Sequence, residues 1–216
     1  MAEPFDPRHA ARLDDPARAD YQPIPDLLGL LALRGDETVV DYGAGVGYTT
    51  VPLAAALPRG LVVAVDRSAE LLDELRRRVT TSAAGRAPAA TAPVEFVHTT
   101  ENRVPLPDAS VDAILTVSVW HEIYDDQSAL AELRRLLAPG GTLAIVDWAP
   151  VERPVGPPAN RILTLEQALA VVASMGLTAD VVRPAGTLFA YFYAIVARAP
   201  ELFLDRQSNS SPLRQA

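Results

Sequence analysis

The chain has 216 residues, of which 49% are hydrophobic, and a formal net charge of −8 at pH 7. A chain of this length and apolarity can bury the core of one domain, so we expect a folded protein rather than a disordered one. The absence of cysteine excludes disulfide bonds, thiolate zinc sites and thiol catalysis. The negative charge argues against a broad surface for nucleic acid or anionic lipid, because both require clustered positive charge.

No part of the sequence has the composition of a membrane segment or a secretion signal. No stretch approaches the roughly 18 uncharged apolar residues that span a bilayer. Residues 1–20 carry charges and prolines without an apolar core. We therefore expect a cytoplasmic protein that does not associate with a membrane.

Apolar runs of two types alternate along the chain. A short amphipathic helix over residues 24–33 precedes a strand over 37–42, a helix over 47–57 and a strand over 60–66. The next predicted helix, over 68–79, begins at the N-cap residue Ser68 and carries Glu70 in its first turn. The remaining predicted elements are, in order, strands over 94–99 and 111–119, a helix over 125–140, a strand over 141–148, a helix over 164–176 and strands over 177–183 and 188–197.

Strands that alternate with helices indicate parallel βαβ units, and hence a doubly wound α/β sheet with helices on both faces. We expect residues 24–200 to form this domain, residues 1–23 to form an N-terminal segment that covers the ligand site, and residues 201–216 to form a flexible tail. In the last predicted strand, one face is Leu188, Ala190, Phe192 and Ala194, and the other is Phe189, Tyr191, Tyr193 and Ile195.

Residues 39–48, VVDYGAGVGY, place three glycines between the first strand and the next helix. Each glycine costs conformational entropy, so the pattern indicates a tight turn or a ligand close to the backbone. The dinucleotide pattern G-x-G-x-x-G/A is not met, because Tyr48 stands at its third small position. Asp41 before the turn would repel a pyrophosphate and attract the ammonium and sulfonium groups of S-adenosylmethionine. Asp66, which ends the second strand, can accept hydrogen bonds from both hydroxyl groups of a ribose.

These motifs resemble those of class I S-adenosylmethionine-dependent methyltransferases, close to the branch that includes ubiquinone/menaquinone-type C-methyltransferases. The resemblance covers residues 24–197 and rests on VVDYGAGVGY, on VVAVDRS, on LPDASVDAILTVSVWHEI and on LLAPGGTLAIVDW. It implies a Rossmann-like sheet of seven strands in the order 3-2-1-4-5-7-6, mostly parallel, with the last strand inserted antiparallel. It also implies S-adenosylmethionine as the cofactor.

The resemblance assigns the cofactor contacts by position. Asp41 would face the methionine end of the cofactor, Asp66 would bind the ribose and Arg67 would flank the adenine. Relatives often carry an aspartate after the third strand that contacts the adenine amino group. Thr99 stands there instead, so this contact falls to Thr99, Thr100 or Glu101, or to backbone groups. The implied cofactor-binding set is Asp41, Gly43, Ala44, Gly45, Gly47, Asp66, Arg67, Thr99, Thr100, Glu101 and Ser118.

Methyl transfer needs alignment of donor and acceptor, and it needs a general base only where the acceptor loses a proton. Residues 118–126, SVWHEIYDD, supply His121, which acts as that base, orients an acceptor or only fixes the loop. Glu122 either orients His121 or is an exposed acid. Arg161 either pairs with an acceptor carboxylate or ties its loop to a nearby acid. The candidate substrate-binding residues are Tyr21, Trp120, Tyr124, Trp148 and Arg161.

The function that we expect is S-adenosylmethionine-dependent methyl transfer to a small-molecule acceptor, without a metal, because the three histidines lack ligand spacing. An inactive S-adenosylmethionine-binding protein is the first alternative, and it would lack an acceptor pocket. An NAD(P)-dependent oxidoreductase is disfavoured by the third glycine and by the absence of lysine, which excludes a Tyr-x-x-x-Lys pair. A nucleic-acid methyltransferase is disfavoured by the negative charge and by the absence of an Asn-Pro-Pro-Tyr/Phe-type motif after the fourth strand.

Overall fold

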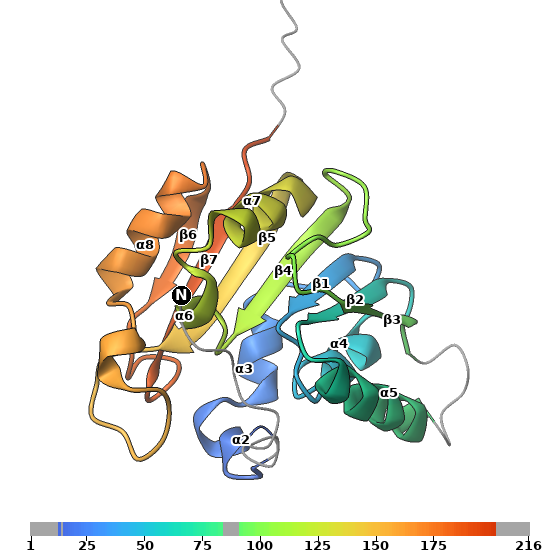
Figure 1. Ribbon diagram of the computed structural model, residues 1–216, viewed down its shortest axis with the longest axis horizontal. Coiled ribbons are helices and arrows are strands. Elements are labelled where there is room, and N and C mark those ends of the chain that lie inside the picture. The colour runs from blue at the N-terminus through green and yellow to red at the C-terminus, as the bar shows by residue number, and fades with distance from the viewer. Residues whose placement is uncertain (1–12, 14, 84–90, 202–216) are drawn as a thin grey trace, which may run out of the picture.

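The computed structural model describes residues 13, 15–83 and 91–201, which form one mixed sheet with helices around it (Figure 1). Within these residues, seven strands lie in the order β3-β2-β1-β4-β5-β7-β6. Neighbouring strands from β3 to β5 pair in parallel, whereas β7 is antiparallel to both β5 and β6. The predicted strand order and the inserted antiparallel strand are confirmed. The strands are β1 (Thr38–Tyr42), β2 (Leu61–Asp66), β3 (Val94–His98), β4 (Val111–Val117), β5 (Leu137–Trp148), β6 (Thr178–Arg183) and β7 (Phe192–Arg198).

The five predicted helices are present, the short helices α2 and α6 were not predicted, and three of the described helices have side-chain caps. At the start of α5, the predicted N-cap Ser68 accepts the N–H of Leu71 at 3.3 Å through its Oγ. At the start of α7, the Asp126 carboxylate accepts hydrogen bonds from the N–H groups of Ser128 and Ala129. At the start of α8, Thr164 and Gln167 form a capping box. The helices are α2 (Arg18–Tyr21), α3 (Ile24–Gly29), α4 (Thr50–Ala56), α5 (Ala69–Ala83), α6 (Trp120–Ile123), α7 (Gln127–Leu136) and α8 (Leu165–Ser174), with a 3-10 turn at Ala159–Arg161.

Helices cover both faces of the sheet, as a doubly wound fold requires (Figure 1). On one face, α6, α7 and α8 bury Trp120, Leu133 and Val172 in a core against the sheet. On the other face, α3 and α4 bury Leu27 and Leu53. α5 packs beside α4 and over β2 and β3. The carboxyl ends of the parallel strands therefore meet at one edge that the helices leave uncovered.

The last strand is present, but its predicted start was wrong, because β7 begins at Phe192 rather than at residue 188. Residues before it form a loop that is closed by a 2.8 Å hydrogen bond from the N–H of Gly186 to the carbonyl of Phe189. Phe189 consequently packs edge-on against Phe192 in the same core instead of alternating with it. Within the strand itself the predicted alternation is confirmed, since Phe192 and Tyr193 belong to opposite cores.

Helix boundaries also differ from prediction, since α3 ends at Gly29 rather than at residue 33 and α5 continues to Ala83 rather than ending at residue 79. The helix after β1 begins at Thr50, because the glycine turn extends through Gly47 with positive φ. The helix predicted to reach residue 140 ends at Leu136, and the next residue already pairs with Val111 of β4. A register shift then separates this pair from the regular pairing that resumes at Ala113. A bulged strand start thus replaces the predicted helical turn.

The ends of the chain are described in part. Residues 1–12, 14 and 202–216 lie outside the described residues, and with them most of the predicted N-terminal segment and of the predicted tail. The described part of the N-terminal segment contains α2, which lies beyond the edge of the sheet where the parallel strands end (Figure 1). None of the described helices is long and apolar enough to cross a membrane.

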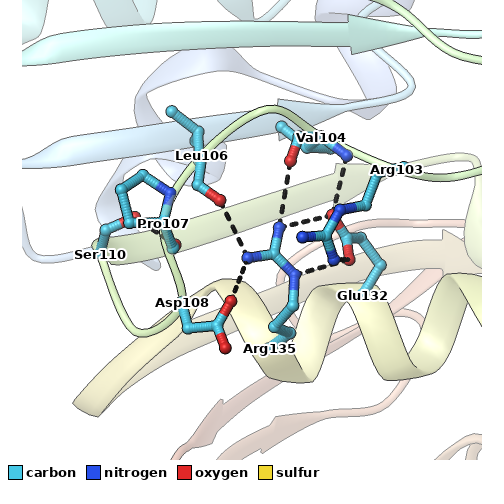
Figure 2. Close-up of polar contacts among 8 residues, drawn as sticks. All are labelled: Arg103, Val104, Leu106, Pro107, Asp108, Ser110, Glu132 and Arg135. Atoms are coloured by element: carbon cyan, nitrogen blue, oxygen red, sulfur yellow. Dashed lines mark hydrogen bonds and ion pairs between the residues drawn. The ribbon is translucent and has the colours of Figure 1, made fainter.

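A buried ion pair fixes the loop between β3 and β4 onto α7 (Figure 2). The Arg135 guanidinium donates to Oε1 of Glu132 at 2.7 Å and to the carbonyl groups of Val104 and Leu106. The side chains of Arg135 and Glu132 are only 16% and 7% exposed. Glu132 also accepts the N–H of Val104, so this carboxylate has partners on both the helix and the loop. Arg103 contacts Glu132 from outside, with a side chain that is 66% exposed.

We expect Arg135→Ala to lower the free energy of unfolding by about 3 kcal/mol, because it leaves the Glu132 carboxylate buried without its main partner. Arg103→Ala removes an exposed contact to the same carboxylate and is expected to cost less than about 1 kcal/mol. Urea unfolding followed by circular dichroism measures both values. Equal losses in the two variants would contradict this account of the network.

The turn from β1 to α4 requires glycine at two positions for steric reasons. Gly43 has φ +81°, and a Cβ there would lie 2.2 Å from Cγ2 of Val119. Gly47 has φ +92°, and a Cβ there would lie 2.1 Å from Cδ1 of Leu75 on α5. Both φ values lie in the left-handed region that L side chains rarely adopt. The two glycines thus let the turn pack closely against its neighbours.

Gly47→Ala is expected to destabilise the protein by about 2–4 kcal/mol, because it combines a left-handed alanine with a clash against Leu75. Gly29→Ala is the matched control, since a Cβ at Gly29 meets nothing within 4 Å. Gly29 ends α3 without a positive φ, so its replacement should be neutral or slightly stabilising. Thermal unfolding of the two variants compares these effects. A stable Gly47→Ala variant would show that the turn adapts without strain.

Candidate functional site

A cavity of about 850 Å³ lies at the carboxyl ends of β1, β2 and β4. Doubly wound sheets bind ligands at this edge, where the strand order reverses, and the order reverses between β1 and β4. Ligand sites commonly have volumes of about 300–1,000 Å³. The predicted site residues that line the cavity are Tyr21, Gly43, Ala44, Gly45, Asp66, Arg67, Thr99, Thr100, Ser118, His121, Trp148 and Arg161. Those that the cavity lining does not include are Asp41, Gly47, Glu101, Trp120 and Tyr124.

Asp66 joins three backbone segments at the floor of the cavity. Its Oδ2 accepts the N–H of Gly45 at 2.7 Å, and its Oδ1 accepts the N–H of Ser68 at 2.9 Å. Burial raises the pKa of Asp66 from its ordinary value, against the opposing effect of these N–H groups. Each carboxylate oxygen has two lone pairs, so each can accept one further hydrogen bond from a ligand. The geometry suits a pair of neighbouring hydroxyl groups.

Asp41 is buried under the turn and does not line the cavity, contrary to the expectation that it faces the cofactor. Its Oδ2 accepts hydrogen bonds from the hydroxyl groups of Thr49 at 2.8 Å and Thr50 at 2.6 Å. Burial raises the pKa of Asp41 to about 6, against the opposing effect of the two hydroxyl donors. Asp41 thus joins the end of β1 to the start of α4, and its charge lies behind the turn rather than in the cavity.

The N-terminal helix α2 brings a cation to the cavity that the sequence analysis missed. The Arg18 guanidinium lies 4.0 Å from the ring centroid of Tyr48, and its Nε donates to Oε1 of Gln22 at 2.8 Å. Gln22 donates in turn to Oγ of Ser118, and its carbonyl accepts the Tyr48 hydroxyl. Arg18, Gln22 and Tyr48 all line the cavity. A four-residue helix has no periodic signal in the sequence, so nothing there distinguished Arg18 from the other arginines.

The predicted adenine side of the cavity lies after β3. Thr99 and Thr100 line it, while Glu101 does not. Asn102 lines it as well and was also missed. Asn102 has φ +60°, accepts the hydroxyl of Tyr42 and donates to the Asp126 carboxylate at 2.9 Å. Its amide is therefore held in place, and the loop that carries the threonines is anchored at this point.

A histidine–aspartate pair lies at the other end of the cavity. Nδ1 of His121 is 2.8 Å from Oδ1 of Asp147, which is fully buried on β5. Oδ1 also accepts the N–H of Trp148 at 2.7 Å, and Oδ2 accepts the N–H of His121 at 3.2 Å. Burial is the largest single effect and would lower the pKa of His121, but the charge and hydrogen bond of Asp147 together with the charge of Glu122 outweigh it and raise the pKa above the ordinary value. Asp147 rather than Glu122 orients this histidine.

Glu122 matches neither predicted alternative fully, because Asp147 orients His121 and the Glu122 side chain is only 19% exposed and lines the cavity. Its Oε1 lies 3.9 Å from Nε2 of His121. Burial and the nearby Asp147 and Asp66 carboxylates raise the pKa of Glu122, while His121 and Arg67 oppose this rise. A carboxyl group and an imidazole nitrogen therefore face the same part of the cavity.

Of the candidate substrate-binding residues, Tyr21, Trp148 and Arg161 line the cavity, whereas Trp120 and Tyr124 do not. Trp120 is fully buried in the core below the cavity. Trp148 does line the cavity, and its ring centroid is 4.2 Å from that of Phe192 and 6.4 Å from that of Tyr21. The loop after β5 completes this wall with residues 154–158 and reaches the cavity again at Arg161.

Comparison with known proteins agrees with this site. Residues 40–145 match the methyltransferase domain family. An uncharacterised methyltransferase of Mycobacterium tuberculosis is 34% identical over 122 residues, which are 56% of each chain. Trans-aconitate 2-methyltransferase of an Azoarcus species is 38% identical over 120 residues, or 56% of this chain and 42% of that protein. A crystal structure of an S-adenosylmethionine-dependent methyltransferase from Aquifex aeolicus aligns with a TM-score of 0.79 and 28% identity, covering 90% of this chain and 99% of that one.

The aligned region spans about half or less of the curated relatives. The family match over residues 40–145 contains the glycine turn, the Asp66 strand end and the fourth strand, which are the parts that build the cofactor side of the cavity. S-adenosylmethionine is the cofactor that the family and the fold indicate. The finer prediction of a ubiquinone/menaquinone-type branch stays a prediction. By its domain and its fold, the chain belongs to the class I S-adenosylmethionine-dependent methyltransferases.

Proposed function

We propose that this protein is an enzyme that transfers the methyl group of S-adenosylmethionine to a small-molecule acceptor. The observation that carries the proposal is the Asp66 carboxylate at the end of β2, which lies in the cavity and anchors the glycine turn through the N–H of Gly45. A ribose diol fits the two lone pairs that remain on this carboxylate. The acids and the glycine turn together favour an adenosyl ligand with positive charge over a dinucleotide.

The other side chains of the cavity fit the remaining groups of this cofactor. Arg18 supplies a guanidinium for the carboxylate of the methionine part. Asp41 supplies negative potential from behind the turn for the ammonium and sulfonium groups. Thr99, Thr100 and the backbone near them supply polar groups for the adenine. The described part of residues 1–23, which contains α2, is proposed to cover the bound cofactor.

The acceptor side favours an enzyme over the two alternatives. A protein that only binds the cofactor would lack an acceptor pocket, whereas His121, Trp148 and Arg161 line the same cavity as the glycine turn. An NAD(P)-dependent oxidoreductase finds no support among the similar proteins that we report above. We propose a cytoplasmic location and no nucleic-acid substrate, on the grounds of composition and charge.

Asp66→Asn is expected to weaken the binding of S-adenosylmethionine and S-adenosylhomocysteine by on the order of 10- to 100-fold, because it removes charge-assisted hydrogen bonds to the ribose. Isothermal titration calorimetry of the purified protein measures both dissociation constants. The exposed Asp73 on α5, whose side chain is 70% exposed, gives the control variant Asp73→Asn, which should bind like the wild type. Tighter binding of NADH than of S-adenosylhomocysteine would overturn the proposal.

Asp41 should make the stability of the ligand-free protein fall as the pH rises. Its carboxyl has a pKa of about 6 in the folded protein against 3.8 for the ordinary group. Below about pH 3, it is largely protonated in both states and has little effect. Between pH 4 and pH 7, the unfolded state loses the proton first, which favours unfolding by about 3 kcal/mol at most.

Asp41→Asn should abolish this fall. The stability of Asp41→Asn relative to the wild type is expected to rise by about 1–3 kcal/mol between pH 4 and pH 7. Chemical unfolding at four or five pH values measures the difference. Asp73→Asn again serves as the exposed control, for which the difference should stay nearly constant. A constant difference for Asp41→Asn as well would contradict the raised pKa of this carboxyl.

A further inference from the structure

Building on the proposed function, we infer that the acceptor is a hydroxyl compound with a planar, mostly apolar body, and that its proton passes to Nε2 of His121. Asp147 is the positioning residue for this histidine. The comparisons with similar proteins give no role to His121 or Asp147. A hydroxyl acceptor also distinguishes this chain from a methyltransferase that esterifies a carboxylate.

The Asp147 carboxylate is fixed by the backbone before it meets the imidazole. It accepts the N–H of Trp148 through Oδ1 and the N–H of His121 through Oδ2. The carboxylate is fully buried, so it cannot turn toward water. A carboxylate accepts hydrogen bonds, so Nδ1 of His121, at 2.8 Å, carries the proton of this pair. The neutral imidazole then has its lone pair on Nε2.

Nε2 of His121 is placed to take up a proton. It makes no hydrogen bond with any residue in the described part of the chain, and its nearest charged group is Oε1 of Glu122 at 3.9 Å. Both side chains line the cavity that also contains the glycine turn. A hydroxyl group between the cofactor and His121 can therefore donate to Nε2, and Glu122 stabilises the imidazolium that results.

At the reacting position beside His121, the two acids disfavour a carboxylate as the methyl acceptor, while Arg161 can hold a carboxylate only elsewhere in the cavity. A carboxylate loses no proton when it is methylated and so makes no use of the histidine–aspartate pair. Glu122 and Asp147 already place two carboxyl groups around His121. A third carboxylate at this point would be repelled by both. The Azoarcus relative is named for trans-aconitate, which is a carboxylate. We do not expect this chain to share that acceptor.

The walls around His121 suit a planar apolar body. Trp148 is held against Phe192 and Tyr21 by tilted ring contacts, which fix the orientation of its ring. The loop that follows it supplies Pro154, Pro157 and Pro158. Arg153 lies 5.5 Å from the Trp148 ring centroid and donates to the carbonyl groups of this loop, including that of Pro157. The loop is thereby held as a wall rather than left as an open chain.

When bound, S-adenosylmethionine would supply the methyl group: its carbon–sulfur bond would break with both electrons left on sulfur as the acceptor oxygen bonds to the methyl carbon. The hydroxyl proton moves to Nε2 of His121, and the charge of the sulfonium is thus replaced by that of an imidazolium. Asp147 and Glu122 face this imidazolium from β5 and α6, while Arg153 faces it from the loop after β5. The two acids raise the pKa of His121, and burial and Arg153 lower it.

Nuclear magnetic resonance of the histidine rings tests the positioning role without any turnover. The chain has three histidines, so His121→Gln identifies the resonances of His121 by their loss. We expect its neutral form to carry the proton on Nδ1 and its titration midpoint to lie above 6.5, the ordinary value. Asp147→Asn should lower this midpoint. Glu122→Gln should also lower it, by a smaller amount, and serves as the test if Asp147→Asn does not fold. A neutral form with the proton on Nε2, or an unmoved midpoint, would overturn the role of Asp147.

Methyl transfer to matched compounds tests the acceptor class. We expect S-adenosylhomocysteine to form with 1-naphthol or 4-nitrophenol and not with 1-naphthoic acid. In the wild type, kcat/KM should rise with pH as His121 loses its proton. His121→Gln should remove this rise and lower kcat/KM by on the order of 100-fold or more, while KM changes little. The control variant Asp73→Asn should leave kcat/KM and its dependence on pH unchanged.

Methylation of 1-naphthoic acid in preference to the two hydroxyl compounds would overturn the inference. So would an unchanged pH profile in His121→Gln, or no transfer to either hydroxyl compound by protein that binds S-adenosylhomocysteine. These outcomes leave the cofactor assignment intact. If the wild-type protein does not bind S-adenosylhomocysteine, the proposed function itself is contradicted.

Discussion

The hydrogen bonds of Asp66 hold the site together, because they join the turn after β1, the end of β2 and the start of α5. Without a carboxylate between them, the N–H groups of Gly45 and Ser68 would have no common acceptor. Asp41 fixes the same turn from the opposite side through Thr49 and Thr50. Both acids are buried, and their raised pKa values show that this arrangement costs stability in the ligand-free protein. A positively charged ligand offsets that cost.

The N-terminal helix α2 connects the two halves of the cavity. Arg18 stacks on Tyr48 beside the glycine turn, while Tyr21 stacks on Phe192 at 6.0 Å and meets Trp148 on the acceptor side. Gln22 lies between them and binds Ser118 at the end of β4. One short helix thus touches the residues proposed for the cofactor and those proposed for the acceptor. This position explains why a segment with so little regular structure has so many specific contacts.

Sequence patterns predicted the parts of the fold that depend on local order. Alternating strands and helices, and glycines beside acids, are visible in the sequence because their physical causes act between near neighbours. The pairing of His121 with Asp147 joins residues 26 positions apart, and no periodic signal reports it. Trp120 was expected in the cavity, but the single turn of α6 directs it into the core instead. Arg18 was missed because its role depends on where α2 packs.

The cofactor side and the acceptor side use the same structural device. Asp66 ends β2 and Asp147 lies next to the end of β5, so both carboxylates reach the edge of the sheet where a ligand binds. Each accepts two backbone N–H groups, from Gly45 and Ser68 in one case and from His121 and Trp148 in the other. Anchored in this way, neither carboxylate can move away to satisfy its charge elsewhere. One offers its remaining lone pairs to a ligand, and the other offers them to an imidazole that faces the ligand. The parallel strands therefore hold both the proposed cofactor contact and the partner of the proposed base by the same backbone geometry.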